Sequence, residues 1–237
     1  MKTTAIVLAA GKGTRMGSDV PKQYMEVNGK PVLCYSLESF QKSGVSDILI
    51  VTDSASVEFV KDLAQQYGIS RVIGVITGGR ERCFSVLNAL RHLAQEDPGP
   101  DYVLIHDGAR PYITSSAVDM LAEAVTRYGA VVAASPSKDT IKLTDREGFV
   151  EDTTDRAVTW CAQTPQCFEF ASILEAYERI VAPLEAGGSA VTVTDDSMVY
   201  EKAFPDKRVK LIDTGSENGK ITTIADLEYM KYFFRQQ

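Results

Sequence analysis

Apolar residues along the first 134 positions of the chain follow two alternating periodicities. Near-continuous apolar runs, typical of strands buried on both faces of a sheet, occur at 5–8, 47–51, 72–77, 102–106 and 130–134. Between them, apolar residues recur at helical spacing, at 31–43, from Ser54 or Ser56 onward, around 86–90, and from Ser115 or Ser116 onward. The residues predicted to end these helices are Gly44, Gly68 and Gly129. The alternation predicts an α/β fold, a single Rossmann-like three-layer domain with a mostly parallel central sheet.

The pattern changes between residues 137 and 168. Residues 140–144 alternate polar and apolar side chains, 146–148 have the composition of a tight turn, and 149–152 continue as a second short strand. We therefore expect a protruding β-hairpin arm, inserted at about 137–160 into one domain that spans residues 1–237. Such an exposed hairpin serves either as a lid or as a subunit contact. The remaining segments predict helices at 172–181, 195–202 and 224–234 and a strand at 209–212.

The loops that follow the predicted strands are expected to hold the ligand. Parallel sheets bind ligands beyond the carboxyl ends of their strands. The loops at 9–17, 78–85 and 107–110 all follow strands and should therefore gather at one rim.

The first of these loops combines glycines with cations. Glycine lets successive backbone N–H groups form an anion-binding concavity, and the glycines here are Gly11, Gly13 and Gly17. Positive charge comes from Lys12, Arg15 and Lys22. The loop is not a Walker A motif, because the Gly-Lys pairs lack the upstream glycine and the following hydroxyl, nor a dinucleotide fingerprint, because Met16 replaces a glycine. It predicts a phosphate site of another type, with a solvated glycine-rich turn as the alternative.

Composition narrows the function classes further. The chain has 237 residues, 44% of them hydrophobic, and a net charge of -7, which argues against a nucleic-acid partner. Four cysteines without a C-x-x-C pair and only two histidines argue against an ordinary zinc site. The sequence shows no cleavable signal, and no apolar run reaches the ~18 residues of a membrane span. We expect a soluble, cytoplasmic protein with reduced cysteines and no membrane partner.

Ordered motifs carry a resemblance to a known family. The first loop, with Ala9-Ala10-Gly11, Arg15 and Pro21-Lys22-Gln23, resembles the nucleotide-binding loop of nucleotidyltransferases acting on sugar or polyol phosphates. The narrower motifs are Gly78-Gly79-x-x-Arg82-x-x-Ser85-Val86, His106-Asp107-Gly108-Ala109-Arg110-Pro111, Asp139-Thr140-Ile141-Lys142, Asp155-Arg156, Gln163-Thr164-Pro165-Gln166, Thr194-Asp195-Asp196 and Gly219-Lys220-Ile221-Thr222. Spread in order over about the whole chain, they resemble the 2-C-methyl-D-erythritol 4-phosphate cytidylyltransferases.

The resemblance implies an enzyme with CTP as one substrate. The family joins CTP and 2-C-methyl-D-erythritol 4-phosphate to give 4-diphosphocytidyl-2-C-methyl-D-erythritol and pyrophosphate, in the non-mevalonate isoprenoid pathway. A divalent cation, normally Mg²⁺, would bind at Asp107. The implied nucleotide-binding residues are Ala9, Ala10, Gly11, Lys12, Gly13, Gly78, Gly79, Ser85, Asp107 and Gly108. Arg15 and Lys22 would stabilise the pentacoordinate α-phosphate as catalytic residues.

The resemblance also implies a second substrate site and a homodimer. The residues implied to bind the polyol phosphate are Arg110, Thr140, Arg156, Thr164, Thr194 and Lys220. Among these, Arg156 and Lys220 would be catalytic, because they aim the attacking phosphate oxygen. The hairpin resembles the family's arm, which exchanges across a homodimer and brings Thr140 and Arg156 to the partner's site. The chain ends soon after its last predicted helix, so we expect the stand-alone enzyme without a fused cyclase domain.

Two departures and two alternatives complete these expectations. Gly108 stands where alanine is also common and is interpreted as a tolerated small residue, whereas Arg80 stands where the family often has an acidic residue. A ribitol-5-phosphate cytidylyltransferase shares several of the motifs, although Thr194-Asp195-Asp196-Ser197 favours methylerythritol phosphate. The alternative of another class is a non-catalytic nucleotide-binding regulatory module. His106 is predicted to be a buried histidine with satisfied hydrogen bonds rather than a catalyst.

Overall fold

One seven-stranded sheet forms the centre of the protein. The computed structural model describes residues 1–11, 20–185, 187 and 192–235. The strands are β1 (Thr3–Leu8), β4 (Asp47–Thr52), β5 (Val72–Thr77), β6 (Tyr102–Asp107), β7 (Ala130–Pro136), β10 (Trp160–Glu169) and β11 (Lys210–Asp213), in the spatial order β11-β7-β10-β6-β1-β4-β5. All neighbouring pairs are parallel except those of β10, which runs antiparallel to β6 and β7. The mostly parallel sheet is therefore confirmed.

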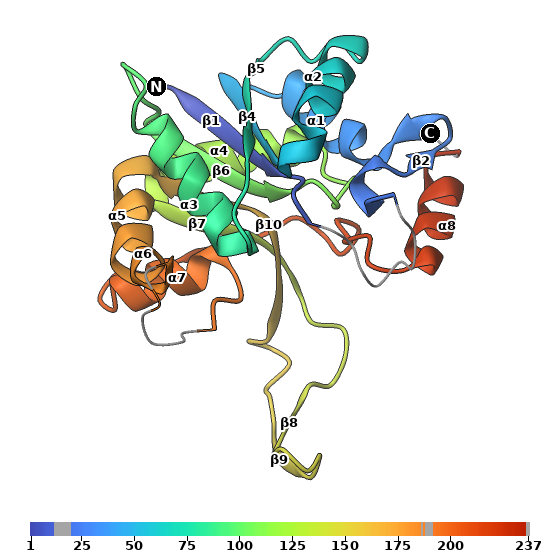
Figure 1. Ribbon diagram of the computed structural model, residues 1–237. Helices are drawn as coiled ribbons and strands as arrows, with labels where there is room; N and C mark the ends of the chain where they lie inside the picture. The colour runs from blue at the N-terminus through green and yellow to red at the C-terminus, as the bar shows by residue number, and fades with distance from the viewer. Residues whose placement is uncertain (12–19, 186, 188–191, 236–237) are drawn as a thin grey trace.

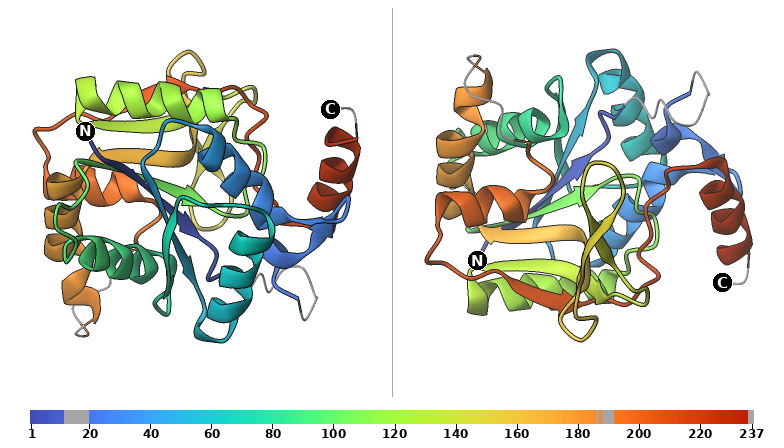
Figure 2. Two further views of the ribbon diagram at one scale, coloured as in Figure 1. Left: turned by 90° about the horizontal axis from the view of Figure 1, so that it is seen from above. Right: turned by 90° about the horizontal axis from the view of Figure 1, so that it is seen from below.

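Helices cover both faces of this sheet (Figures 1 and 2). One layer contains α1 (Val32–Lys42), α2 (Val57–Gln66) and α4 (Ser115–Tyr128), and the other contains α3 (Arg82–Leu93), α5 (Phe170–Ile180), α6 (Ala182–Glu185) and α7 (Asp196–Ala203). Along β1 the fully buried side chains alternate, because Ala5 and Val7 pack in the first layer and Ile6 in the second. The three-layer prediction is confirmed by this pair of apolar cores.

Strand β10 was not predicted, although it lies between two central strands. Its register shifts between Ala162 and Gln166, and Pro165 stands inside the strand. Both features interrupt the continuous apolar run by which the other strands are recognised. Beyond the irregularity, Cys167 and Phe168 are fully buried on opposite faces of the sheet. The strand therefore belongs to the core although its first half reads as a loop.

Helix ends agree only partly with the predictions. Gly68 and Gly129 have positive φ values of 64° and 75°, as expected for glycines that end helices. Gly44 does not end α1, because Ser43 already adopts an extended conformation. Of the two serines from which the second helix was predicted to begin, Ser56 is the N-cap residue of α2, but its side chain makes no capping hydrogen bond. The carboxylate of Asp53 instead accepts from the backbone N–H groups of the 3₁₀ turn η3 (Ser54–Ser56) that precedes α2.

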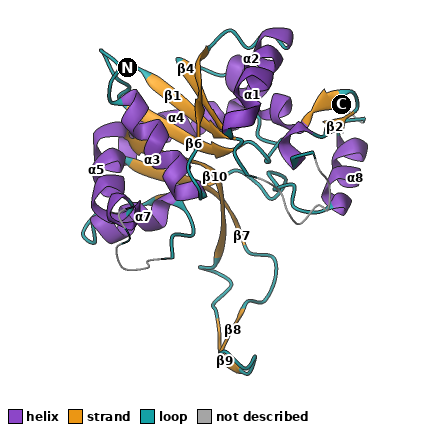
Figure 3. Ribbon diagram, in the orientation of Figure 1, coloured by secondary structure: helices purple, strands orange, loops and turns teal. Residues whose placement is uncertain are grey.

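The predicted arm is present as an antiparallel hairpin of β8 (Lys142–Thr144) and β9 (Val150–Thr153). It projects from the body of the protein well beyond the sheet (Figures 1 and 3). Gly148 lies in the turn with a φ of 91°. Large apolar side chains on the arm are exposed, with Phe149 at 68% and Val158 at 74%. Such exposure is typical of a surface that another molecule covers.

A small additional layer lies beside the sheet. The hairpin of β2 (Glu26–Val27) and β3 (Lys30–Pro31) turns at Asn28 and Gly29, both with positive φ. Helix α8 (Ile224–Phe233) packs against it and begins with a capping box formed by Thr223 and Asp226. In the part of the chain that the structure describes, no helix is long and apolar enough to cross a membrane.

Candidate active site

A pocket of about 720 Å³ opens at the carboxyl ends of the central strands. The three loops predicted to share a rim meet there because sheet hydrogen bonding continues into each of them. Ala9 N–H donates to Val51 O at 2.7 Å, Gly78 N–H donates to Thr52 O at 2.7 Å, and Gly108 N–H donates to Leu8 O at 2.8 Å. For residues 9–11, 78–85 and 107–110, which the structure describes, the prediction that these loops gather at one edge of the sheet is confirmed.

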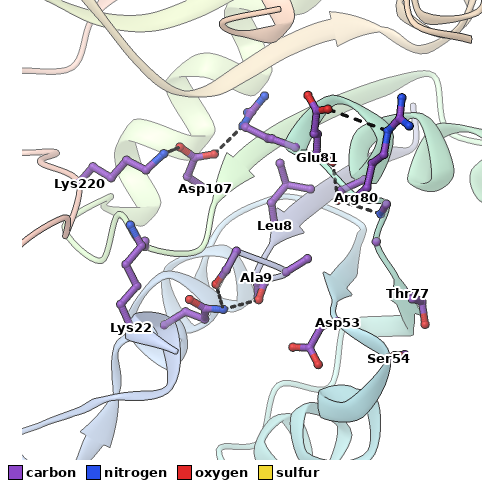
Figure 4. A pocket seen from close by; sticks show the side chains of 18 of the residues that line it. Leu8, Ala9, Lys22, Asp53, Ser54, Thr77, Arg80, Glu81, Asp107 and Lys220 are labelled. Atoms are coloured by element: carbon purple, nitrogen blue, oxygen red, sulfur yellow. Dashed lines mark hydrogen bonds and ion pairs between the residues drawn. The ribbon is translucent and has the colours of Figure 1, made fainter. Parts of the chain in front are cut away.

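Most of the predicted nucleotide-binding residues that the structure describes line this pocket. They are Ala9, Ala10, Gly11, Gly78, Gly79, Ser85 and Asp107, together with the predicted catalytic residues Lys22 and Lys220. Figure 4 shows Lys22, Asp107 and Lys220 on one side of the pocket and Asp53, Ser54 and Thr77 on the other. Lys12, Gly13 and Arg15 lie outside the described residues.

At two positions of the loop after β5, only glycine fits without a local shift. A Cβ on Gly78 would lie 2.6 Å from Ser85 Oγ, and a Cβ on Gly79 would lie 2.9 Å from the backbone carbonyl carbon of Phe84. The hydroxyl of Ser85 accepts from Gly79 N–H at 3.0 Å and donates to Glu81 O at 3.1 Å. In this geometry Ser85 holds the loop.

Gly108 does not line the pocket but packs closely against the end of β1 and the start of α1. A Cβ at this position would lie 3.0 Å from Leu8 O and 2.8 Å from Leu33 Cδ1, so even alanine would require a local shift. The neighbouring departure, Arg80, lines the pocket edge, where its guanidinium stacks 4.6 Å from the ring centroid of Phe84 and donates to Leu184 O at 3.1 Å. Arg80 thus packs on the protein surface.

The first loop is tied to the segment that carries Lys22. The side-chain amide of Gln23 donates to Ala9 O at 2.5 Å and to Gly11 O at 2.9 Å. Next to it, Lys22 Nζ donates to Ile221 O at 2.7 Å. Lys22 and Lys220 therefore approach each other from segments almost two hundred residues apart in sequence, which only the fold brings together.

Asp107 ends β6 among cations. Its Oδ1 accepts from Arg82 Nε at 2.9 Å and its Oδ2 accepts from Lys220 Nζ at 2.6 Å. Burial by itself would raise the pKa of Asp107, but the positive charges of Arg82 and Lys220 outweigh burial and hold that pKa well below its ordinary value. The pocket therefore contains an ionised carboxylate at neutral pH.

Arg82 was quoted in a motif but not predicted as a site residue, and it is the centre of the charge network. Its Nη1 and Nη2 donate to the two oxygens of Asp196, each at 2.8 Å, and Asp196 is fully buried. Tyr177 donates a further hydrogen bond to Asp196 from the core. Burial would lower the pKa of Arg82, and the two carboxylates raise it well above its ordinary value.

The Thr194-Asp195-Asp196 motif therefore has a structural function in this protein. Asp195 caps α7 by accepting from Met198 N–H at 2.9 Å, and Asp196 holds Arg82 from the first turn of that helix. Thr194 is exposed and contacts Met198 Sδ at 3.3 Å. It does not line the pocket, so its predicted contact with substrate stays a prediction.

His106 and Thr164 form a buried chain of hydrogen bonds beneath Asp107. Asp107 N–H donates to Thr164 Oγ at 3.0 Å. Because a carbonyl oxygen only accepts, the neutral imidazole of His106 carries its proton on Nε2, which donates to Arg110 O at 3.1 Å. Its Nδ1 then accepts from the hydroxyl of Thr164, 3.1 Å away. This confirms the prediction for His106, and the predicted contact of Thr164 with substrate remains a prediction, because its hydroxyl is engaged by protein partners.

The buried imidazole gives folding stability a specific dependence on pH. Burial lowers the pKa of His106 to about 4, below the value near 6.5 of an unfolded chain. The imidazole therefore binds a proton more tightly in the unfolded chain. The contribution of His106 to the free energy of unfolding is complete above pH 6.5 and is lost as pH falls towards 4. We expect the free energy of unfolding to fall by about 3 kcal/mol over this window.

Denaturant unfolding at a series of pH values measures this loss. His106→Gln is expected to flatten the pH dependence of unfolding between pH 6.5 and 4, and His92→Gln is the matched control because it removes the other histidine. An unchanged slope in His106→Gln would assign the pH dependence to other groups.

Comparisons with known proteins identify the family. The model of the 2-C-methyl-D-erythritol 4-phosphate cytidylyltransferase family matches residues 3–236. The chain belongs to this family. It is 41% identical to the 2-C-methyl-D-erythritol 4-phosphate cytidylyltransferase of Lachnospira eligens, over 98% of this chain and 99% of that protein. The protein of the same name from Lachnoclostridium phytofermentans is 39% identical, over 99% of this chain and 97% of that protein.

The architecture is also shared with a solved member of the cytidylyltransferase family. The crystal structure of 4-diphosphocytidyl-2C-methyl-D-erythritol synthase from Anaerococcus prevotii superimposes with a TM-score of 0.85 at 29% identity, covering 99% of this chain and 96% of that one. The α/β fold with a mostly parallel sheet, predicted from the sequence, is therefore shared with this synthase.

The remaining residues predicted to bind the polyol phosphate do not line the pocket within one cytidylyltransferase chain. Thr140 and Arg156 are exposed on the arm, which extends away from the body (Figure 1). Arg110 lies behind Asp107, where its Nη1 donates to Asn218 O at 2.8 Å and its Nε is 4.0 Å from Asp107 Oδ2. The chain by itself thus brings together most of the predicted nucleotide-binding residues that the structure describes and leaves the arm residues apart.

Proposed function

We propose that this pocket transfers the cytidylyl group of CTP to 2-C-methyl-D-erythritol 4-phosphate and releases pyrophosphate. The observation that carries the proposal is the charged group of Lys22, Lys220, Arg82 and Asp107 at the carboxyl ends of β1 and β6, in a chain of this family. The activity places the protein in the non-mevalonate isoprenoid pathway as a transferase. Pyrophosphate release from CTP in the presence of the polyol phosphate tests it.

The proposed reaction is an in-line displacement at the α-phosphorus of CTP. An oxygen of the polyol phosphate forms a new P–O bond, the bond between the α- and β-phosphates breaks, and pyrophosphate leaves. Both reactants are anions, so cations must offset their repulsion. Lys22 and Lys220 supply positive charge on the pocket wall, and Arg15 is predicted to add a planar guanidinium. A phosphate monoester is already a nucleophile at neutral pH, so positioning and charge stabilisation account for catalysis.

Asp107 is the residue we propose to hold Mg²⁺. Mg²⁺ prefers one or two carboxylates together with substrate phosphates, and Asp107 supplies an ionised carboxylate on the pocket wall. Among the described residues no group of three or more metal-ligating side chains exists, which fits a cation that shares its ligands with a triphosphate. When bound, the cation would neutralise negative charge on that triphosphate.

We propose that the loop after β5 forms the side of the pocket that holds the cytosine of CTP. Gly79→Ala would force its Cβ against the Phe84 backbone and displace this loop. We expect the KM for CTP to rise about tenfold, as overpacking by about 1.4 kcal/mol would produce, while the KM for the polyol phosphate is unchanged. Initial-rate kinetics measure both constants, with Gly99→Ala as the control because its Cβ meets nothing closer than 3.5 Å. Equal changes in both KM values would contradict the assignment.

We further propose a homodimer in which the arm of one chain completes the site of the other. The exposed apolar side chains of the arm and the distance of Thr140 and Arg156 from the pocket of their own chain support it. In this arrangement Arg156 and Thr140 bind the polyol phosphate at the partner's Lys220. We also propose a cytoplasmic location, in keeping with the four free cysteines.

Mixing two inactive variants tests whether Arg156 acts across the dimer. Arg156→Ala and Lys22→Ala are each expected to be nearly inactive, but a heterodimer of the two contains one site with both residues intact. Random reassociation of equal amounts should restore about a quarter of the wild-type activity per chain. The measurement is pyrophosphate release after mixing and subunit exchange. If Arg156 acts within its own chain, no activity returns.

A further inference from the structure

The loop 218–221, which carries Lys220, is held in place by a buried polar side chain that does not line the pocket. Asn218 is 3% exposed, and its Nδ2 donates to Thr164 O at 2.7 Å. A carbonyl oxygen only accepts hydrogen bonds, so this contact fixes which end of the amide is the donor. The side chain thereby connects the loop to β10 in the centre of the sheet.

Two more hydrogen bonds close the loop against the end of β6. Arg110 Nη1 donates to Asn218 O at 2.8 Å, and Ile221 N–H donates to Ala109 O at 2.8 Å. The side chain of Ile221 is fully buried in the small core beside the sheet. The loop is therefore anchored on both sides of Lys220.

Together with the chain of hydrogen bonds beneath Asp107, these bonds form a closed ring of four residues. Thr164 donates to His106 Nδ1, His106 donates to Arg110 O, Arg110 donates to Asn218 O, and Asn218 donates back to Thr164 O. Asp107 N–H enters the ring through the hydroxyl of Thr164. The ring thus fixes the backbone of Asp107 and the backbone of the Lys220 loop in one network.

We propose that Asn218 is a positioning residue of the transfer reaction, which sets the place of Lys220 Nζ over Asp107. The inference rests on the proposed function. Lys220 Nζ lies 2.6 Å from Asp107 Oδ2, and Ile221 O accepts from Lys22 Nζ at 2.7 Å, so displacement of this loop moves one lysine directly and alters the partner of the other. Asn218 acts through these groups and does not contact the pocket.

A double-mutant cycle separates positioning from general stability. Asn218→Ala is expected to lower kcat/KM for the polyol phosphate about tenfold in the parent chain, and only about twofold in Lys220→Ala, because the group it positions is then absent. The KM for CTP should stay unchanged in both backgrounds. Ser36→Ala is the matched control, since Ser36 is fully buried, loses one hydrogen bond, to Leu33 O, and makes no hydrogen bond to the loop.

Amide hydrogen exchange of the ligand-free protein supplies a readout that does not depend on activity. Asn218→Ala should accelerate exchange of the Ile221 amide, whose acceptor is Ala109 O, while Ser36→Ala leaves it protected. Equal losses of kcat/KM in the two backgrounds, or unchanged exchange at Ile221, would overturn the proposal. Absence of pyrophosphate release from the parent chain would instead overturn the proposed function, and the exchange measurement would still decide whether Asn218 holds the loop.

Discussion

Replacing Arg82 with leucine is expected to lower the free energy of unfolding at pH 7 by about 3 to 5 kcal/mol. Asp196 is fully buried at the start of α7 and accepts both of its short ion-pair contacts from Arg82. Removal of the guanidinium would leave this carboxylate without a countercharge in the core, and Tyr177 alone does not neutralise it. The same substitution removes one of the two cations that donate hydrogen bonds to the carboxylate of Asp107.

Denaturant unfolding with Arg91→Leu as a matched control tests this expectation. Arg91 also forms a two-carboxylate network, with Glu178 at 2.7 Å and Glu185 at 2.9 Å, but all three side chains are at least a third exposed. An exposed network of this kind contributes about 1 kcal/mol or less. Adding Asp196→Asn to Arg82→Leu should recover part of the loss. Equal losses in the free energy of unfolding for Arg82→Leu and Arg91→Leu would show that the buried pair of Arg82 and Asp196 stabilises the fold no more than an exposed network does.

Lys22→Ala is expected to lower kcat by roughly 10²- to 10³-fold, about 3 to 4 kcal/mol of transition-state stabilisation. Lys22 lines the pocket and approaches the Lys220 loop, where its Nζ is held at Ile221 O. We propose that this point charge acts on the α-phosphate as negative charge develops there. The same loss is predicted for Arg15→Ala, on the resemblance of its motif.

Steady-state pyrophosphate release under saturating substrates measures this effect. Lys30→Ala is the matched control, since Lys30 lies on the same N-terminal segment, pairs with Glu38 at 2.6 Å and does not line the pocket. Its kcat should equal that of the wild type. Unchanged kcat in Lys22→Ala would remove this lysine from the catalytic group and leave it a role in anchoring the loop.

The sequence predicted those parts of the fold that depend on local pattern. β1, β4 and β6 are continuous apolar runs, and such runs in alternation with amphipathic helices leave few arrangements other than a covered parallel sheet. The hairpin at Asn28 and Gly29 was missed although that pair is a strong turn signal. Strand β10 was missed because its irregular half carries buried polar residues, and most of their hydrogen-bond partners lie far away in the sequence, on β6, on β7 and in the segment after β11.

The residues of the candidate site were likewise predictable where they follow a local pattern and not where they depend on distant partners. Gly11, Gly78 and Gly79 of the rim loops are recognisable because they follow strands, and the structure places them around one pocket. The pairing of Arg82 with Asp196 joins residues 114 positions apart, and no local pattern predicts which carboxylate a cation meets. In the homodimer that we propose, the positions of Thr140 and Arg156 relative to a pocket depend on a second chain, which the sequence suggests only through family resemblance.

Pyrophosphate release from CTP, measured in parallel with 2-C-methyl-D-erythritol 4-phosphate and ribitol 5-phosphate as acceptors, tests the central claim most directly. The account predicts release that requires a divalent cation, is rapid with methylerythritol phosphate and is much slower with ribitol phosphate. Equal or faster release with ribitol phosphate would contradict the proposed acceptor. Binding of CTP without any release of pyrophosphate, with either acceptor and with Mg²⁺ present, would contradict cytidylyl transfer itself and favour a nucleotide-binding module.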